Sequence, residues 1–340
     1  MLKNIGIIGE GKMGTNLLYY LLDMDFTLTW ICSQESDTEK LERTLIKRLT
    51  RTFEAGIINE KRFHNIQEKI TISKRPEDLT GCDLIIEAIS EEIHAKQKLF
   101  QVLDSVASPE CIFTSNSSSI NPSDLVPSEK RKDKFAGLHF FYPIALKNIV
   151  EVIKTPDTSK DTIKKITSFL ERIQRNFLML EEKDGFILNR IFLYFQNEAF
   201  LLTKENKASI LQIDRIVKEN FFPIGVFEFF DSVGLDIMLS SVKNYLKYDP
   251  APEQFYPLIL QLEEHVSNGR LGVKKNGGFY REGILYDPGK PENDTQIILK
   301  LADSYKLAFN NLCHSSSIPT QELKMAMDEY FSAETPPVKQ

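Results

Sequence analysis

The feature that most constrains the fold is a glycine motif near the N-terminus. Residues 3–8 (KNIGII) form a short, mostly apolar run, as in a buried parallel strand. The sequence Gly9-Glu10-Gly11-Lys12-Met13-Gly14 follows at once, and residues 15–22 have the pattern of a helix. A strand, GxGxxG and a helix in this order indicate a loop that binds the diphosphate of a dinucleotide. The alternative is a glycine-rich turn that binds no ligand.

Each glycine of the motif has its own physical reason. Gly9 permits the tight turn, Gly11 lets the backbone approach a diphosphate, and Gly14 lets the helix pack closely on the strand. The first turn of the helix would add amide donors and a partial positive charge. The candidate cofactor-binding residues of this loop are therefore Gly9, Gly11, Lys12, Met13 and Gly14.

Further predicted strands recur along the first half of the chain. They fall at residues 26–31, 70–72, 83–88, 112–115, 135–139 and 150–153, with helices at 91–106 and 159–175. Strands that alternate with helices predict a mostly parallel sheet covered on both faces. From residue 186 onward the pattern favours helices alone. The predicted fold class is α/β, a Rossmann-type doubly wound sheet followed by an all-α C-terminal domain.

The length of 340 residues predicts about two domains. The change of pattern near Asp184 divides them into a dinucleotide-binding domain, 1–183, and a helical substrate and dimerisation domain, 184–288. Residues 289–340 follow a polar linker and form a C-terminal extension with one helical segment from 295 to about 331. This segment is either a shortened repeat of the second domain or a helix packed on its surface.

Composition excludes several classes of protein. The hydrophobic fraction is 42%, the charged fraction 26% and the net charge −6, so a protein that coats nucleic acid is not expected. No apolar run reaches the roughly 18 residues of a membrane span, and the N-terminus lacks the pattern of a signal peptide. The 4 cysteines lie far apart without a CxxC pair, so we expect no metal site and a reducing cytoplasm.

A basic stretch interrupts this mildly acidic background. Residues 38–69 read as polar helices broken near Gly56, and residues 43–62 contain six basic side chains against Glu54 and Glu60. The simpler interpretation is a solvated helix pair. The alternative is a cationic lip for a phosphate-bearing substrate, with Arg48 and Arg51 as candidate ligands.

A histidine and a carboxylate form the candidate reaction centre. His139 ends a predicted strand, where ligands bind in an open parallel sheet. Glu151 lies in the apolar stretch NIVEVI, and a buried carboxylate needs a partner that a histidine could supply. Together they would make an oriented general base, whereas His139 alone could equally be structural.

With these motifs in place, the chain resembles the L-3-hydroxyacyl-CoA dehydrogenases over roughly residues 3–286. The resemblance rests on stretches in the same order along the chain: IGIIGEGKMG, DLIIEAISE, TSNSSSI, GLHFFYP, VEVI, GFILNR, FPIG, VGLD and GFY. It implies that His139 takes the proton from the substrate's 3-hydroxyl while hydride passes to nicotinamide, and that Glu151 orients this imidazole. It also implies that Ser118 hydrogen-bonds the substrate oxygen and that Asn189 helps to hold the reacting groups.

The resemblance also implies further cofactor contacts, and the chain departs from the family pattern at two positions. Glu91, Lys96 and Lys274 match positions that contact the cofactor. Cys32 stands where the family has an Asp that binds the adenine ribose, so NAD is expected while NADP stays open. Tyr142 replaces an Asn on the nicotinamide side and could reshape the pocket.

These observations lead to one function and two alternatives. We expect NAD(H)-linked interconversion of (3S)-3-hydroxyacyl and 3-oxoacyl thioesters of CoA. One alternative is the same chemistry on a short or polar acyl group held by an acyl carrier protein in a biosynthetic pathway; the other is a cofactor-binding subunit without catalysis. Residues 191–195 and 199–202 are apolar almost all round the helix, as in a fully buried helix or a subunit interface. The apolar helices, together with the resemblance, predict a homodimer through the helical domain.

Overall fold

The computed structural model describes residues 2–280 and 293–331 of the chain. It divides into two compact units, Met1–Glu182 and Lys183–Gln340. The polar linker at 286–289 and the predicted boundary between 288 and 289 lie outside the described residues.

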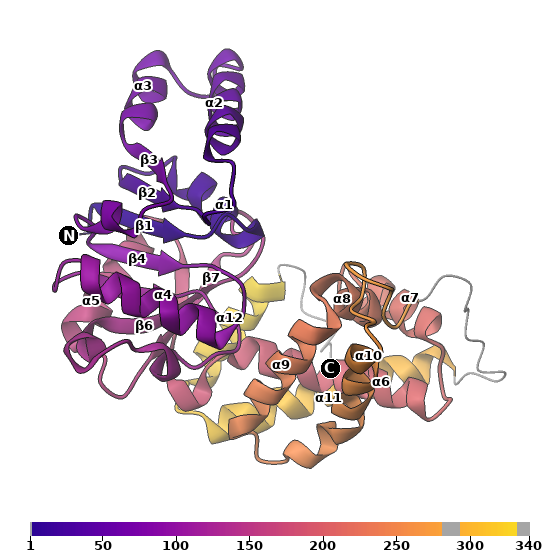
Figure 1. Cartoon of the computed structure of the whole chain (residues 1–340). Helices are drawn as coiled ribbons and strands as arrows, with labels where there is room; N and C mark the ends of the chain where they lie inside the picture. Colours follow the sequence, from indigo (N-terminus) through magenta and orange to yellow (C-terminus); the bar gives the residue numbers. More distant parts are fainter. Residues whose placement is uncertain (1, 281–292, 332–340) are drawn as a thin grey trace. The chain divides into compact units, whose positions relative to one another are not determined.

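The first unit is built on one eight-stranded sheet of order β3-β2-β1-β4-β5-β6-β7-β8 (Figure 1). The strands are β1 (Asn4–Ile8), β2 (Thr27–Ile31), β3 (Ile70–Ser73), β4 (Leu84–Glu87), β5 (Ile112–Ser115), β6 (Phe135–Phe140), β7 (Ile149–Lys154) and β8 (Asn176–Glu181). Each adjacent pair is parallel except β6 and β7, which are antiparallel. The strand order reverses between β1 and β4, the place where such sheets bind ligands. This topology confirms the predicted doubly wound fold.

Strand β8 has no counterpart among the predicted elements. After the exposed Asn176, its sequence NFLMLE alternates between half-buried and buried side chains, and the strand pairs in parallel with β7 at the edge of the sheet. Six residues next to a predicted helix carry a weak local signal. The strand exists because β7, more than twenty residues earlier, supplies the hydrogen-bonding partner.

Helices cover both faces of the sheet. They are α1 (Lys12–Leu21), α2 (Thr38–Glu54), α3 (Glu60–Glu68), α4 (Ile93–Val106) and α5 (Lys160–Arg172). Leu18 of α1 and Phe169 of α5 belong to one hydrophobic core, and Phe100 of α4 belongs to a second core. Polar N-cap side chains start several of these helices; Asp37, for example, accepts a hydrogen bond from the Lys40 amide.

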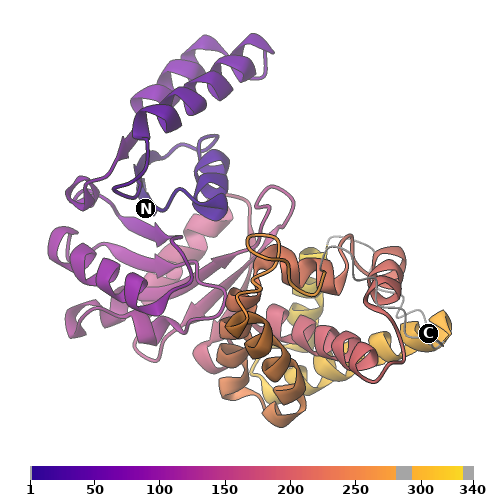
Figure 2. The same cartoon turned by 45° about the vertical axis from the view of Figure 1, so that its right-hand side comes forward.

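The basic stretch forms the helix pair α2 and α3, separated near Gly56, whose φ of +70° suits glycine. Figures 1 and 2 show this pair extending beyond the β3 edge of the sheet. The predicted break in the helical stretch is therefore present.

The second unit is helical, as predicted. Its helices are α6 (Ile187–Lys204), α7 (Ile210–Asn220), α8 (Val226–Val233), α9 (Leu235–Tyr245), α10 (Tyr256–Ser267), α11 (Asp294–Ser315) and α12 (Thr320–Phe331). Short 3-10 turns in the two units span Pro76–Leu79, Pro122–Leu125, Glu129–Lys134, Glu182–Asp184, Leu246–Tyr248 and Pro252–Phe255. The prediction of a single helical segment from 295 to 331 is wrong in one respect, because this region forms two helices, α11 and α12. Pro319 lies in the break, where its ring disfavours helix at the preceding residue.

Helix α6 is buried on nearly all sides within the second unit. Helix α11 packs along it, and α10 and α12 also contact it. The apolar character of α6, which suggested a subunit interface, is thus largely satisfied inside the chain. Among the described helices none is long and apolar enough to cross a membrane.

Candidate active site

The carboxyl ends of the parallel strands β1, β4, β5 and β6 lie next to one another at one edge of the sheet. The glycine loop follows β1, the acidic segment 87–92 begins at the end of β4, the serines 117–119 follow β5, and His139 is near the end of β6. Residues from four separate segments therefore gather at one site.

The glycine loop has the geometry of a diphosphate cradle. Gly9 has φ +108°, and a Cβ there would lie 2.6 Å from the Ala88 carbonyl oxygen. A Cβ on Gly14 would lie 2.1 Å from the Gly9 oxygen, so the helix can approach the loop only with glycine. A Cβ on Gly11 would meet nothing within 4 Å, and no side chain caps the N-terminus of α1. The backbone amides of Lys12 and Met13 lie in the first turn of α1. This uncapped N-terminus of the helix can donate hydrogen bonds to an anionic group.

His139 and Glu151 form a buried pair. They face each other across the antiparallel strands β6 and β7, and Nδ1 of His139 lies 2.8 Å from Oε2 of Glu151. The two side chains are 6% and 0% exposed. Phe141 packs on the imidazole with ring centroids 4.3 Å apart. The carboxylate therefore fixes the orientation of the ring.

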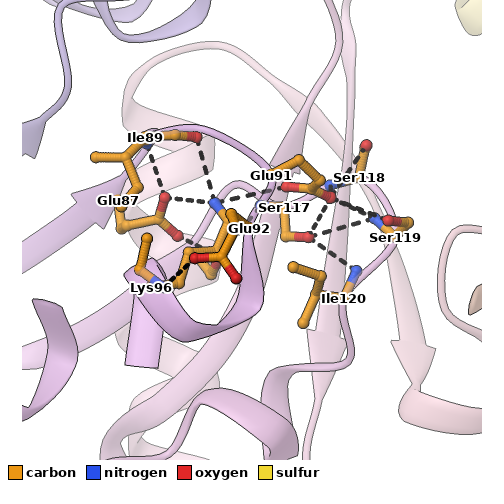
Figure 3. A network of polar contacts seen from close by, with 11 residues as sticks. Glu87, Ile89, Glu91, Glu92, Lys96, Ser117, Ser118, Ser119 and Ile120 are labelled. Carbon is orange, nitrogen blue, oxygen red and sulfur yellow. Dashed lines mark hydrogen bonds and ion pairs between the residues drawn. The ribbon is translucent and has the colours of Figure 1, made fainter. Parts of the chain in front are cut away.

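Glu91 organises the serine loop after β5. Its Oε1 accepts hydrogen bonds from the Ser118 amide at 2.9 Å, the Ser119 amide at 3.0 Å and the Ser117 hydroxyl at 2.6 Å (Figure 3). Burial tends to raise the pKa of Glu91, but the Lys96 ammonium and these donors outweigh it and lower the pKa. The anionic form of Glu91 thus holds Ser118 in place.

Lys96 is an internal cation in this site. Its ammonium lies 2.5 Å from Oε1 of Glu87 and 3.5 Å from Oε2 of Glu91, and the side chains of Lys96 and Glu87 are 1% and 0% exposed (Figure 3). Glu87 also accepts from the Ser115 hydroxyl at 2.6 Å. Sequence reasoning gave Glu87 no individual role. Its sequence context could have indicated a buried partner, because Glu87 ends an apolar strand in the same way that Glu151 interrupts one.

Two asparagines anchor the segment that carries Tyr142. Asn116 accepts a hydrogen bond from the Phe140 amide at 2.8 Å, and Asn16 accepts one from the Ile144 amide at 2.7 Å. Tyr142 lies between these anchors and is 56% exposed. Its ring is therefore placed on the surface of the segment that follows His139.

Cys32 follows β2 and is 4% exposed. Burial, and next the nearby charge of Glu10, raise the pKa of its thiol to about 12. A neutral thiol cannot replace a carboxylate that binds ribose hydroxyls. Glu10, from the glycine loop, accepts a hydrogen bond from the amide of the neighbouring Ser33 at 3.1 Å.

Asn189 and Lys274 belong to the helical unit. Asn189 is in the first turn of α6; its Nδ2 donates to the Tyr245 hydroxyl at 3.1 Å, and its Oδ1 accepts from the Tyr330 hydroxyl at 3.3 Å. Tyr330 comes from α12 in the C-terminal extension and was not among the predicted site residues. Lys274 pairs with Asp236 at 2.6 Å.

The two candidate arginines lie on α2. The Arg48 guanidinium stacks over the Tyr19 ring at 4.3 Å, and Arg51 is exposed in the last turn of the helix. Both observations fit the simpler interpretation of a solvated helix pair, and the cationic lip stays a proposal. Within residues 2–280 and 293–331, no group of three or more His, Cys, Asp or Glu side chains could hold a metal ion.

A doubly wound sheet with a glycine-rich loop at its switch point defines a dinucleotide-binding protein. The comparisons with known proteins narrow this class. The family model described as "3-hydroxyacyl-CoA dehydrogenase, NAD binding domain" matches residues 4–183, and "3-hydroxyacyl-CoA dehydrogenase, C-terminal domain" matches residues 185–282. The chain belongs to the 3-hydroxyacyl-CoA dehydrogenase family and is an oxidoreductase. Helices α11 and α12 lie beyond the matched residues.

Individual relatives agree with this assignment. Hydroxyacyl-coenzyme A dehydrogenase, mitochondrial, of Rattus norvegicus is 31% identical over 288 residues, which cover 83% of this chain and 91% of that protein. The structure of (S)-3-hydroxybutyryl-CoA dehydrogenase from Ralstonia eutropha has a TM-score of 0.71 and 28% identity, covering 84% of this chain and 100% of that one. For 3-hydroxybutyryl-CoA dehydrogenase from Escherichia coli the TM-score is 0.69 and the identity 25%; the match covers 84% of this chain and 61% of that one.

Proposed function

We propose that this protein interconverts (3S)-3-hydroxyacyl and 3-oxoacyl thioesters of CoA with NAD(H) as the hydride carrier. Three features support the proposal: the open glycine loop at the switch point, the buried His139–Glu151 pair, and family membership over both matched segments. The single observation that carries it is the 2.8 Å contact between His139 and Glu151 at the strand ends. That contact supplies the oriented base that oxidation of an alcohol requires.

The proposed mechanism assigns each side chain one task. His139 takes the proton of the 3-hydroxyl during oxidation and returns it during reduction. Glu151 keeps the imidazole oriented for this proton transfer. Ser118, held by Glu91, donates a hydrogen bond to the substrate oxygen, and the Asn189 amide helps to hold the reacting groups. When bound along the glycine loop, the nicotinamide cofactor supplies the hydride acceptor or donor.

Catalysis by the purified full-length chain tests the proposal directly. With a 3-oxoacyl-CoA and NADH, the absorbance of NADH should fall, and the product should be the (3S)-3-hydroxyacyl-CoA. The proposal would be abandoned if acyl chains of several lengths gave no turnover with either NADH or NADPH.

An acyl carrier protein is the second candidate for the carrier to which the acyl group is bound as a thioester. Tyr142, exposed after β6 where the resembling family has Asn, is the observation that favours a different acyl partner. Turnover of one acyl group should be compared as its CoA and its carrier-protein thioester. Equal or faster turnover with CoA would count against the carrier-protein version.

We also propose a homodimer formed through the helical unit. Leu260 of α10 and Leu299 and Leu307 of α11 are exposed and leave apolar surface for a partner. Light scattering at micromolar concentration should then give twice the chain mass of 39.1 kDa. We also propose a cytoplasmic location, because the four cysteines are free. Cell fractionation tests this location.

A further inference from the structure

The carboxylate of Glu10 reaches from the glycine loop to the end of the neighbouring strand β2. Its Oε2 accepts from the Ser33 amide at 3.1 Å, and its Oε1 accepts from the Ser33 hydroxyl at 2.6 Å and from the Ser36 hydroxyl. The reach is short because β1 and β2 are adjacent parallel strands that end in register, Ile8 opposite Ile31. A middle residue of the glycine motif is thereby fixed to the segment after β2.

The carboxylate is ionised at neutral pH. Burial tends to raise the pKa of Glu10, but the hydrogen bonds from Ser33 and Ser36 outweigh burial and lower it. The negative charge of Glu10 also contributes to the raised pKa of the Cys32 thiol. The anion therefore lies within electrostatic reach of Cys32, at the end of β2.

The end of this strand is where dinucleotide-binding sheets distinguish their cofactors. A carboxylate there accepts hydrogen bonds from the ribose hydroxyls of NAD and repels the 2′-phosphate of NADP. Cys32 cannot do either, because its thiol is buried and neutral. Glu10 brings a carboxylate to the same strand end from the adjacent loop.

We infer that Glu10 is the residue that makes this site prefer NAD(H) to NADP(H). The inference rests on the proposed use of a nicotinamide dinucleotide. An opposing charge is also present: the Lys74 ammonium donates to the Gln34 carbonyl at 2.8 Å, close to the same strand end. A lysine there attracts a 2′-phosphate, so the preference depends on the carboxylate that competes with it.

Equilibrium binding to the full chain tests this without turnover. Trp30 is the single tryptophan, and its Nε1 donates to the Gly9 carbonyl at 2.9 Å, so its fluorescence reports on ligands in the glycine loop. The unaltered chain should bind NAD⁺ more tightly than NADP⁺. In Glu10→Gln, the ratio of the NADP⁺ to the NAD⁺ dissociation constant should fall by about 10-fold or more, since a charge-assisted hydrogen bond is lost and Lys74 is left unopposed.

Glu35→Gln is the matched control, because it removes the same charge from an exposed side chain one residue from Ser36. Its dissociation-constant ratio should equal that of the unaltered chain. An unchanged ratio in Glu10→Gln, or a preference of the unaltered chain for NADP⁺, would overturn this inference alone. Binding of neither dinucleotide to the unaltered chain would overturn the proposed function as well.

Discussion

At the scale of single residues, the ionic groups of the site are held by buried partners. Glu151 orients His139, Glu91 holds the serine loop, and Glu87 neutralises Lys96. Charged groups buried in this way need a counter-charge or several hydrogen bonds, because water does not solvate them. The same contacts therefore satisfy the buried charges and fix the orientation of the side chains that carry them.

Replacement of His139 by alanine should abolish most turnover and leave cofactor binding intact. Loss of a general base costs about 100- to 10,000-fold in rate. The measurement is NADH consumption together with Trp30 fluorescence on NAD⁺ addition. His64→Ala, an exposed histidine of α3, is the control and should keep full activity. A fully inactive parent protein would instead favour the cofactor-binding subunit without catalysis.

Glu87→Gln should destabilise the first unit, because it removes the nearer counter-charge of the buried Lys96 ammonium and leaves only Glu91, at 3.5 Å. Breaking one partner of a buried pair costs about 3–5 kcal/mol. Urea denaturation followed by circular dichroism measures the change. Glu129→Gln removes an exposed partner of Lys132 and should change the free energy of unfolding by less than about 1 kcal/mol. Equal effects of the two substitutions would contradict the role given to Glu87.

At the scale of elements, the two units differ in what fixes the candidate binding residues: a close approach of helix to loop in the first unit, and a contact between two helices in the second. Helix α1 meets the loop after β1 through Gly14, and the loop remains open at Gly11. In the helical unit, α12 from beyond the family match reaches Asn189 at the start of α6. The glycine motif thus shapes the candidate cofactor loop of the first unit, and α12 supplies a hydrogen-bond partner to Asn189 within the second unit.

Gly14→Ala should destabilise the first unit by about 1–3 kcal/mol, as overpacking does, because its Cβ would lie 2.1 Å from the Gly9 oxygen. Gly11→Ala provides the comparison. Its Cβ meets nothing within 4 Å, so the melting temperature should stay the same while NAD⁺ binds more weakly. Calorimetry and Trp30 fluorescence distinguish the two effects. A stable Gly14→Ala protein that binds NAD⁺ normally would refute this account of the loop.

Tyr330→Phe should slow turnover without unfolding the protein, because it removes only the hydroxyl that donates to Asn189 Oδ1. One hydrogen bond contributes about 0.5–1.5 kcal/mol, so we expect a decrease in kcat of about 2- to 10-fold. Tyr256→Phe, which alters an exposed tyrosine of α10, is the control. In an Asn189→Ala background the Tyr330 substitution should have no further effect; an equal decrease there would show that the two side chains are uncoupled.

At the scale of the whole molecule, the two compact units have different kinds of cores. The first packs helices on both faces of a sheet, and the second packs α10, α11 and α12 around the buried helix α6. Buried ionisable groups occur in the helical unit as well as in the sheet unit. His265, for example, is buried and packs on Phe279 with ring centroids 4.9 Å apart.

Stability should therefore fall as the pH is lowered from about 6.5 to about 4. Burial, and next the charge of Arg270, lower the pKa of His265 to about 4, whereas the unfolded chain binds this proton near 6.5. Between these values the unfolded state holds more protons, so acid favours unfolding, by about 1–3 kcal/mol from this group. Burial raises the pKa values of Asp214 and Asp231, which acts in the opposite direction.

The difference between the parent and His265→Gln isolates the histidine from these aspartates. Urea denaturation at about pH 7 and about pH 5 should show a smaller loss of stability in the variant than in the parent. Parallel pH profiles of the two proteins would exclude His265 as the source.

Local patterns in the sequence determined the strands, the glycine loop, the helical second half and the need of Glu151 for a partner. These follow from hydrophobic periodicity and turn chemistry over a few residues. The tertiary structure alone decided the edge strand β8 and the partners of Glu10, Glu91 and Asn189. Those contacts join residues 23 to 141 positions apart. Only the folded sheet and the packed helices bring such residues together, and no local pattern encodes which of them will meet.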